Sequence, residues 1–321
     1  MKTMTWLVRR EFWEHKGMFF WAPIIVGLVL TAFIGASILY GTVASHGMPS
    51  HVTVNGTEVD AVPPESRAAM AHAMAAGYMA VSAPLFLMLG VVLFFYCLGA
   101  MYDERRDRSI LFWKSLPISD QMTVLSKVAA ALLVAPLITI AVATLVSVTA
   151  VLMGTAGMAV KGMNLFGLLL STPEFYTTPF KVLGLLPVYV LWALPTIGWL
   201  LMVSSWARSK VFLWAVGVPL LAIVAVKLVN RQYGFDWNVD WFIEHVILRT
   251  LGSLFPGIWL AFERIAPEQL VSVASPHSFD SGAVFLRSWA MLGKPSLWFG
   301  ALAGGAMIFA AMRLRRWRDE G

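Results

Sequence analysis

Histidines and carboxylates gather in one polar stretch of the chain, and these side chains can bind a metal ion. They are His46, His51 and His72, with Glu58 and Asp60 between them. Structural metal sites bring their ligands together at characteristic short spacings. No such spacing repeats here, so we expect neither a metal nor a resident cofactor in this chain.

The sequence contains no pattern typical of nucleotide binding or of intramembrane catalysis. The chain has no G-x-x-x-x-G-K-[ST] loop for nucleotide phosphates, and its only Gly-Lys pair, Gly293-Lys294, is followed by proline. An intramembrane enzyme would have only the histidines above in its favour, because no Ser/His/Asp or paired-carboxylate spacing occurs. We therefore expect the chain not to be an enzyme. Any energy that it uses must come from another subunit.

The composition is that of a membrane protein. Of the 321 residues, 59% are hydrophobic and 13% are charged, and the mean hydropathy is +0.73. Soluble domains are about 45–50% apolar and about 25% charged. The single cysteine, Cys97, excludes an intrachain disulfide. The net charge of +6 comes from clusters beside apolar runs, which indicates orientation and anionic-lipid contact rather than nucleic-acid binding.

Six apolar runs are long enough to cross a hydrocarbon core of about 30 Å as helices. The predicted spans are residues 18–40, 77–102, 124–153, 182–206, 211–229 and 295–312. The predicted outer loops are residues 41–73, 154–181 and 230–294. No Asp, Glu or His lies deep in these spans, which argues against an ion-coupled carrier. We expect an all-α membrane protein with one domain over residues 1–321.

Basic residues predict the orientation of the chain. They cluster in short segments at both termini and in the 103–121 and 207–210 loops, whereas those of the outer loops are spread thinly. Both termini are therefore predicted to be cytoplasmic. Residues 4–16, with Trp6 and Trp13 on one face, indicate an interfacial helix before the first span. The alternative is a charged flank that only orients that span.

Several residues predict local features of the helices. Pro187 and Pro195 lie inside the fourth span and predict a kink. Gly300 and Gly304 permit a close helix contact, although a lipid-facing position is equally open. Lys127 is expected to extend its amine to the inner membrane surface.

Residues 237–264 have a helical pattern but carry charges. A span containing Glu244 and Arg249 would cost about 2.5–3.5 kcal/mol for each charge at the bilayer centre. One more span would also place the basic C-terminus outside. We therefore predict interfacial or re-entrant helices here, with residues 251–262 as the best candidate for the re-entrant piece.

The loop after the second span carries the most distinctive sequence. Residues 103–108 are all charged, and a short amphipathic piece follows over residues 109–116. Pro117 ends that piece, and Ser119 or Asp120 is expected to cap the next helix. A loop that only marks topology has no need of four consecutive large apolar residues beside water, and such patches usually indicate a partner or a lipid surface. These residues are Ile110, Leu111, Phe112 and Trp113.

The string E-R-x-D-x-S-I-L-F-W-K-S-L-P-I-S-D over residues 104–120, with Ser126-Lys127 after it, resembles the first cytoplasmic loop of type 2 ABC transporter permeases. The order of spans extends the resemblance over the whole chain. One difference is Arg108-Ser109, where the family often has Gly-Thr.

The resemblance implies a function and partners. The loop would hold a coupling helix that docks on a separate ATPase subunit, which binds ATP and Mg²⁺. Two ATPase copies and a second permease copy would complete an exporter in the bacterial cytoplasmic (inner) membrane. A homodimer is the expected form, and a heterodimer with a sister permease stays open. The implied docking residues are Glu104, Arg105, Arg108, Ile110, Leu111, Phe112, Trp113, Lys114 and Pro117, with Arg208 and Lys210 as a second contact.

A second hypothesis keeps the ATPase but not the cargo. The long outer region 230–294 also suits an ABC-linked sensor or mechanotransmission scaffold that acts without a transported substrate. The sequence does not identify a substrate.

Overall fold

The computed structural model describes residues 2–44, 52–54, 57–59, 63–107, 118–234, 238–266, 270–272 and 275–317. In this part of the chain, six helical segments are long and apolar enough to cross a membrane. They are Gly17–Val43, Pro64–Arg106, Asp120–Val160, Pro173–Trp206, Leu213–Tyr233 and Pro295–Arg316. Each overlaps one predicted span, so the predicted helical fold with six segments suited to a multi-pass membrane protein is confirmed.

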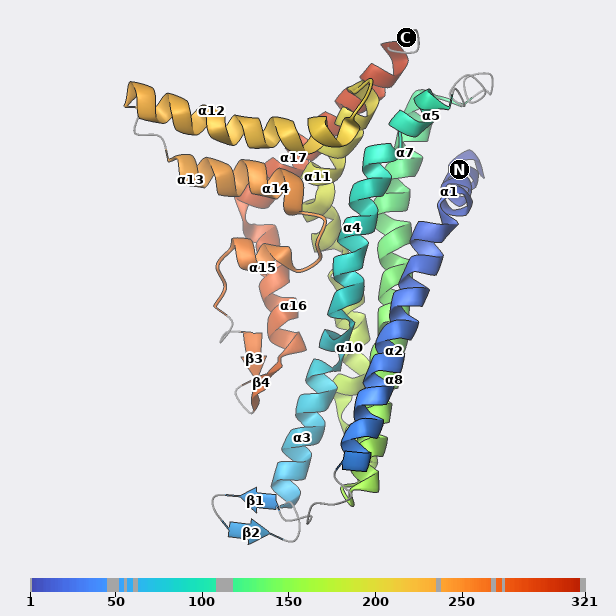
Figure 1. Cartoon of the computed structure of the whole chain (residues 1–321), viewed down its shortest axis with the longest axis vertical. Coiled ribbons are helices and arrows are strands. Elements are labelled where there is room, and N and C mark those ends of the chain that lie inside the picture. The colour runs from blue at the N-terminus through green and yellow to red at the C-terminus, as the bar shows by residue number, and fades with distance from the viewer. Residues whose placement is uncertain are drawn as a thin grey trace.

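The first half of the chain forms long helices that run along the long axis of the molecule (Figure 1). The helical elements are α1 (Lys2–Glu14), the π-helical turn η1 (Gly17–Trp21), α2 (Ala22–Ala44), α3 (Pro64–Gly77), the 3-10 turn η3 (Tyr78–Ser82), α4 (Ala83–Gly99), α5 (Tyr102–Arg106), α7 (Asp120–Ala129), the π-helical turn η4 (Ala130–Val134) and α8 (Ala135–Val160). Strands β1 (Val52–Val54) and β2 (Thr57–Val59) pair antiparallel at the far end. We call the opposite end, which carries both chain termini, α1 and α5, the terminal end.

Two of these helices continue into segments that the sequence predicts as loops. α3 occupies residues 64–77 of a stretch assigned mainly to the loop 41–73, and α8 reaches Val160. The Asp120–Val160 segment has 41 residues, which is about 60 Å of helix and about twice the apolar core. Alanine, the best helix former, recurs through α3, and Pro64 lies in its first turn, where proline is tolerated.

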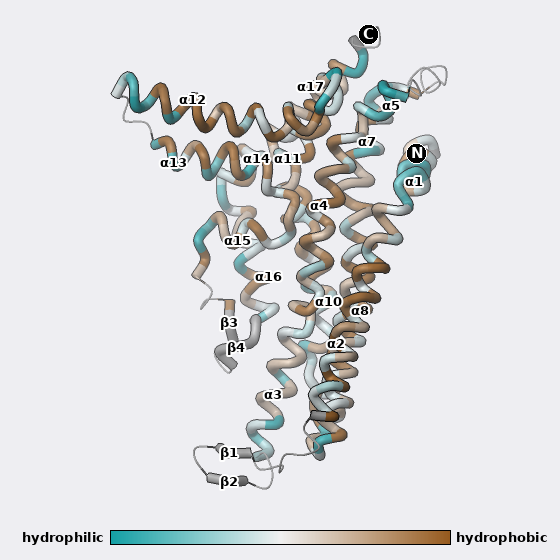
Figure 2. Tube along the Cα trace, viewed as in Figure 1, coloured by the Kyte–Doolittle hydropathy of each residue, from teal (hydrophilic) through white to brown (hydrophobic). Residues whose placement is uncertain are grey.

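The second half of the chain contains shorter elements. They are α9 (Phe166–Ser171), α10 (Pro173–Gly184), α11 (Leu186–Trp206), the π-helical turn η5 (Leu213–Gly217), α12 (Val218–Tyr233), α13 (Val239–Phe242), the π-helical turn η6 (Ile243–Leu248), α14 (Arg249–Gly252), α15 (Ile258–Phe262), the antiparallel strands β3 (Val271–Ser272) and β4 (Ser275–Phe279), α16 (Ser281–Ala290), the 3-10 turn η8 (Met291–Gly293) and α17 (Pro295–Trp317). Figure 2 shows hydrophobic residues along α4, α8 and α12, and hydrophilic ones at α1, α5 and the end of α17.

The described residues 238–266 contribute no candidate span, in agreement with the prediction for residues 237–264. α12 contacts α13 and η6, and these helices lie across the long axis of α2 and α8 (Figure 1). α14 connects to α15 through a turn in which Gly257 has a φ of +85°, a left-handed conformation that suits glycine. Residues 249–262 thus turn back on themselves beside α11.

The predicted kink in the fourth span is an interruption of the helix. α10 ends at Gly184, and α11 starts at Leu186 with Pro187 in its first turn. Proline has no amide hydrogen to donate, and the first turn of a helix is where this matters least. Pro195 lies inside α11 and is buried. The break therefore falls just before Pro187.

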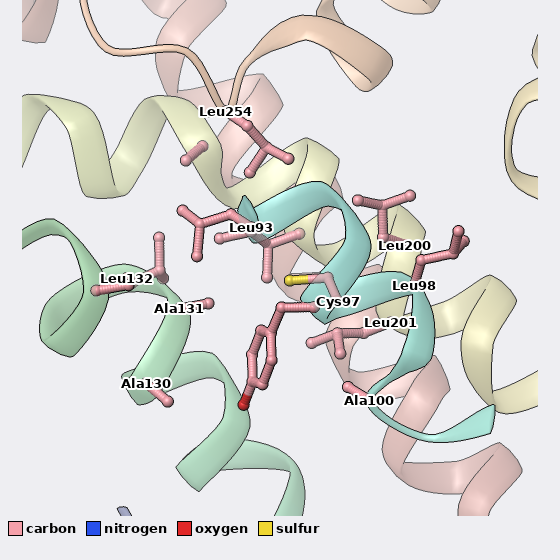
Figure 3. Packing of buried hydrophobic residues seen from close by; sticks show 14 of the residues in the cluster. Leu93, Cys97, Leu98, Ala100, Ala130, Ala131, Leu132, Leu200, Leu201 and Leu254 are labelled. Atoms are coloured by element: carbon pink, nitrogen blue, oxygen red, sulfur yellow. The ribbon is translucent and has the colours of Figure 1, made fainter. Parts of the chain in front are cut away.

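The main core lies where α4, η4 and α11 meet. Figure 3 shows Leu93 and Cys97 of α4 close to Leu132 of η4, Leu200 of α11 and Leu254 of the turn after α14. All five side chains are buried. Cys97 is a free, fully buried thiol that acts as a packing residue.

Glycine brings α11 and α17 into direct contact. A Cβ added to Gly198 would collide with the backbone of Gly304, and a Cβ on Gly304 would collide with the backbone of Leu194 and Pro195. The close-contact interpretation of Gly304 is therefore confirmed. Gly300 faces the Arg249 side chain, which occupies the space of the missing Cβ.

We expect Gly304→Ala to destabilise the fold, because the added methyl group meets backbone that cannot change rotamer. The cost of such overpacking is about 1–3 kcal/mol. Gly305→Ala is the matched control, since a Cβ there meets nothing within 4 Å. Thermal unfolding of the purified protein in detergent measures both. Equal melting temperatures for the two variants would show that the α11–α17 crossing is not tightly packed.

Candidate functional site at the terminal end

Charged side chains from four helices meet at the terminal end, next to the charged loop. Three basic and three acidic residues take part, and most are largely buried. They are Arg10 and Glu11 of α1, Glu104 of α5, Asp120 and Lys127 of α7, and Arg315 of α17. We call this set the charge network.

Glu11 is the most enclosed member of the charge network, with a side chain that is 0% exposed. Lys127 donates from Nζ to both of its carboxylate oxygens, at 3.0 and 3.1 Å. The Tyr96 hydroxyl donates to Oε2 at 3.0 Å, and Arg10 donates to Oε1 at 2.7 Å. These contacts attach α1 to both α4 and α7. A buried carboxylate needs such partners, because an unpaired charge is expensive to remove from water.

Glu104 extends the network to the loop and to the C-terminal helix. Its Oε1 lies 3.0 Å from Lys127 Nζ, and its Oε2 accepts from Arg315 at 2.7 Å. Arg315 also donates from Nε to Asp120 at 3.2 Å. Glu104 lies near the start of the 103–121 loop, and Asp120 lies near its end. The two ends of the loop are thus held by one arginine of α17.

The helix after the loop begins at the residue that the sequence indicates. Ser119 is the N-cap of α7, and its side chain accepts a hydrogen bond from the Met122 amide. Capping by Ser119 is therefore confirmed, while Asp120 in the first helical turn binds Arg315 instead. This arrangement satisfies an amide of the first turn and leaves the carboxylate free for the network.

Arg105 connects the start of the loop to the end of α11. It donates to the carbonyl oxygens of Ser204 and Ala207, at 2.5 and 2.9 Å. The Ser204 hydroxyl accepts from the amides of Met101 and Tyr102, at 3.0 Å each. The first turn of α5 is therefore fixed to the last turn of α11. The 207–210 turn follows directly, so the described start of the 103–121 loop lies next to the second predicted docking segment.

The predicted docking residues fall into two groups. Glu104 and Arg105 are half-buried and bonded as described, whereas Arg208 and Lys210 are exposed in the turn after α11. The remaining predicted residues lie outside the described part of the chain. These are Arg108, Ile110, Leu111, Phe112, Trp113, Lys114 and Pro117.

Sequence reasoning missed two central members of the charge network. Lys127 was expected to reach the membrane surface, but its side chain is 2% exposed because Glu11 and Glu104 neutralise it inside the protein. That prediction is wrong. Glu11 was treated as part of an interfacial helix or of a charged flank, yet it lies one helical turn after the fully buried Leu7. An acidic residue on the apolar face of α1 is the signal that could have identified it.

Groups that could hold a metal already have protein partners. Ligand atoms of Glu11, Glu14 and His15 lie within 4.8 Å of one another, but the Glu11 carboxylate accepts from three side chains. Among the histidines of the sequence analysis, His72 lies 3.6 Å from Glu174, and His46 and His51 are outside the described residues. We assign no metal to either group.

No family model, curated protein or solved structure matches the chain.

We expect Glu11→Gln to lower the stability of the protein strongly. It removes one partner of a buried ion pair, a change that costs about 3–5 kcal/mol. Glu244→Gln is the matched control, because its partner Arg264 is 81% exposed and such pairs contribute about 0–1 kcal/mol. Thermal unfolding in detergent compares the two. A loss for Glu11→Gln no larger than that for Glu244→Gln would contradict the central role of Glu11.

Proposed function

We propose that this chain is the transmembrane subunit of an ATP-driven ABC transporter, of the exporter type, whose separate ATPase subunit docks on the 103–121 loop and the 207–210 turn. The main support is the position of these two segments. Arg105 bonds to the Ala207 carbonyl, so a single partner can contact both segments at once. The sequence of the loop, with its four large apolar residues, provides the anchors that buried interfaces use.

The charge network supplies a path for mechanical coupling. Both flanks of the loop bind Arg315 of α17, and Glu104 also contacts Lys127, which holds α1 through Glu11. A rigid connection between a docking element and packed helices can transmit a two-state movement. ATP and Mg²⁺ would be bound by the ATPase, because the sequence contains no nucleotide-binding loop of its own. Closure of two ATPase subunits would thereby move α4, α7 and α17.

The same proposal orients the protein in a bacterial cytoplasmic membrane. The terminal end carries most of the basic clusters and would face the cytoplasm. α1 would then lie as an elbow helix on the inner leaflet, with Trp6 and Trp13 about half exposed toward lipid headgroups, at 51% and 54%. Lys16 lies 4.9 Å from the Trp13 ring, which suits a helix at that depth.

A second permease copy would complete the transporter, as a homodimer in the simplest form. The alternative function is an ABC-linked sensor or mechanotransmission scaffold without a transported substrate. It is favoured by the folded region after α12, where α16 packs against α10 and α15. Transport of a labelled substrate by reconstituted vesicles decides between the two functions.

We expect the double variant Phe112→Ala with Trp113→Ala to remain inserted in the membrane but to lose its ATPase partner, because the proposed anchors are gone. Trp298→Ala with Phe299→Ala is the matched control, since these neighbours are exposed at the other end of α17. The measurement is purification through a C-terminal tag, with copurifying proteins identified and ATP hydrolysis assayed. Intact copurification with the first variant would refute this choice of anchors.

Arg105→Gln tests coupling rather than docking. The variant loses the hydrogen bonds to Ser204 and Ala207 but keeps the apolar anchors, so we expect the ATPase to bind while transport per ATP falls severalfold. Arg106→Gln removes the neighbouring charge, which is exposed, and is expected to leave coupling unchanged. The ratio of transport to ATP hydrolysis in vesicles measures the effect. The same ratio in both variants would mean that Arg105 does not transmit movement.

A further inference from the structure

One buried charged residue, Arg249, lies outside the charge network. Arg249, at the start of α14, is 6% exposed, and its guanidinium lies 4.3 Å from the centre of the Trp192 ring on α11. It donates to the carbonyl oxygens of Ser296 and Leu297, at 2.6 and 3.4 Å. Burial lowers the pKa of this guanidinium, which shows that the position disfavours a cation. None of the described carboxylates forms an ion pair with Arg249.

Two donors at this position are left without an acceptor. Arg249 Nε and Trp192 Nε1 are both buried and have no hydrogen-bond partner among the described residues. A buried donor without an acceptor costs free energy, and a buried cation without an anion costs more. These two donors, of which one belongs to the guanidinium itself, fit a ligand that brings anionic oxygen atoms.

An apolar cavity lies one helical turn away along α11. It has a volume of about 170 Å³, and its lining includes Tyr189, Leu185, Gly257 and Trp259. The break between α10 and α11 and the left-handed turn at Gly257 both border it, so two backbone irregularities face one space. Tyr189 and Trp192 are three residues apart on α11 and therefore share a face. A cavity of this size holds a small apolar group.

We propose that Arg249 and Trp192 bind the anionic head of an amphipathic molecule, a phosphate or carboxylate, and that the part of its apolar chain next to the head enters the cavity lined by Tyr189 and Trp259. Under the proposed function such a molecule is the transported cargo, and this is the one part of the inference that rests on that function. The binding site itself is a property of this chain alone.

Binding requires a movement of residues 249–262, because both unpaired nitrogens are enclosed. Few polar contacts hold this segment on α11: Thr196 donates to the Arg249 carbonyl at 3.2 Å, the Ser253 amide donates to Thr196 at 3.2 Å, and Tyr189 donates to Leu254 at 3.1 Å. Weakening them favours the open form. A ligand that binds the open form then binds more tightly, since less free energy is spent on opening.

The first experiment measures binding of radiolabelled dodecyl phosphate to the purified full chain in nanodiscs of neutral lipid, without any ATPase. We expect saturable binding, competition by dodecanoate, about tenfold weaker competition by dodecanol, and none by inorganic phosphate. Equal competition by dodecanol would overturn the anionic head. Equal competition by inorganic phosphate would overturn the apolar half of the site.

Variants of the head site separate binding from structure. We expect Arg249→Gln to raise the Kd about tenfold, and Arg249→Lys, which keeps the charge, to raise it less. Thr196→Val removes two contacts that hold the segment closed and is expected to lower the Kd. Thr149→Val, at an exposed position whose hydroxyl bonds within α8, is expected to leave the Kd unchanged. An altered melting temperature with an unchanged Kd for Arg249→Gln would overturn the proposal.

Variants of the cavity remain informative if Arg249→Gln does not fold. Val284→Trp fills the cavity from α16 and is expected to weaken dodecyl phosphate binding. Val224→Trp on α12, which is 53% exposed, is its control. Equal binding by these two variants would refute the assignment of the chain to the cavity. Loss of the ATPase partner in the Phe112 and Trp113 variant leaves this binding intact, so the two proposals fail separately.

Discussion

The ion pair between Glu11 and Lys127 determines how the terminal end is built. Its two side chains are 0% and 2% exposed, so neither charge can be hydrated if the other is absent. The pair therefore fixes α1 against α7. Once Lys127 is held there, Glu104 can approach it from α5, and Arg315 of α17 can approach Glu104 in turn. These contacts fix the positions of Glu104 and Asp120, which lie near the two ends of the 103–121 loop.

This arrangement contrasts with the side of the molecule that carries α12. The charge network ties together helices that are distant in sequence, whereas α12 is largely exposed and packs mainly against its own sequence neighbours η5, α13 and η6. Local contacts alone do not fix the direction in which a helix leaves the bundle. The terminal end is thus the part in which helices distant in sequence are bonded to one another, and under the proposed function a movement imposed there would be passed on to α4, α7 and α17.

The sequence predicts what depends on local composition. Six continuous apolar runs and the Ser119 cap could be identified because their signals lie within a few residues of one another. The Glu11–Lys127 pair joins residues 116 positions apart, so each appeared as an ordinary flanking charge. Whether Gly304 points toward α11 or toward lipid depends on how α17 is rotated about its own axis. Sequence spacing alone does not give that rotation. The helical extension over residues 64–77 has no strong apolar period, and only its alanine content favours it.

α11 and α17 connect the two buried cationic sites. On α17, Arg249 binds the first turn and Arg315 lies in the last turns. On α11, Trp192 contacts Arg249, and Ser204, nearer the C-terminal end of the helix, binds Arg105. The distance from Trp192 to Ser204 along the helix is about 18 Å. Between these points, the backbones of α11 and α17 are in direct contact at Gly198 and Gly304. A force on the loop would therefore act on this closely packed pair, and its effect at Arg249 would be a displacement of α11 and α17 relative to residues 249–262. Under the proposed function, that displacement is what would expose Arg249 to an anionic head.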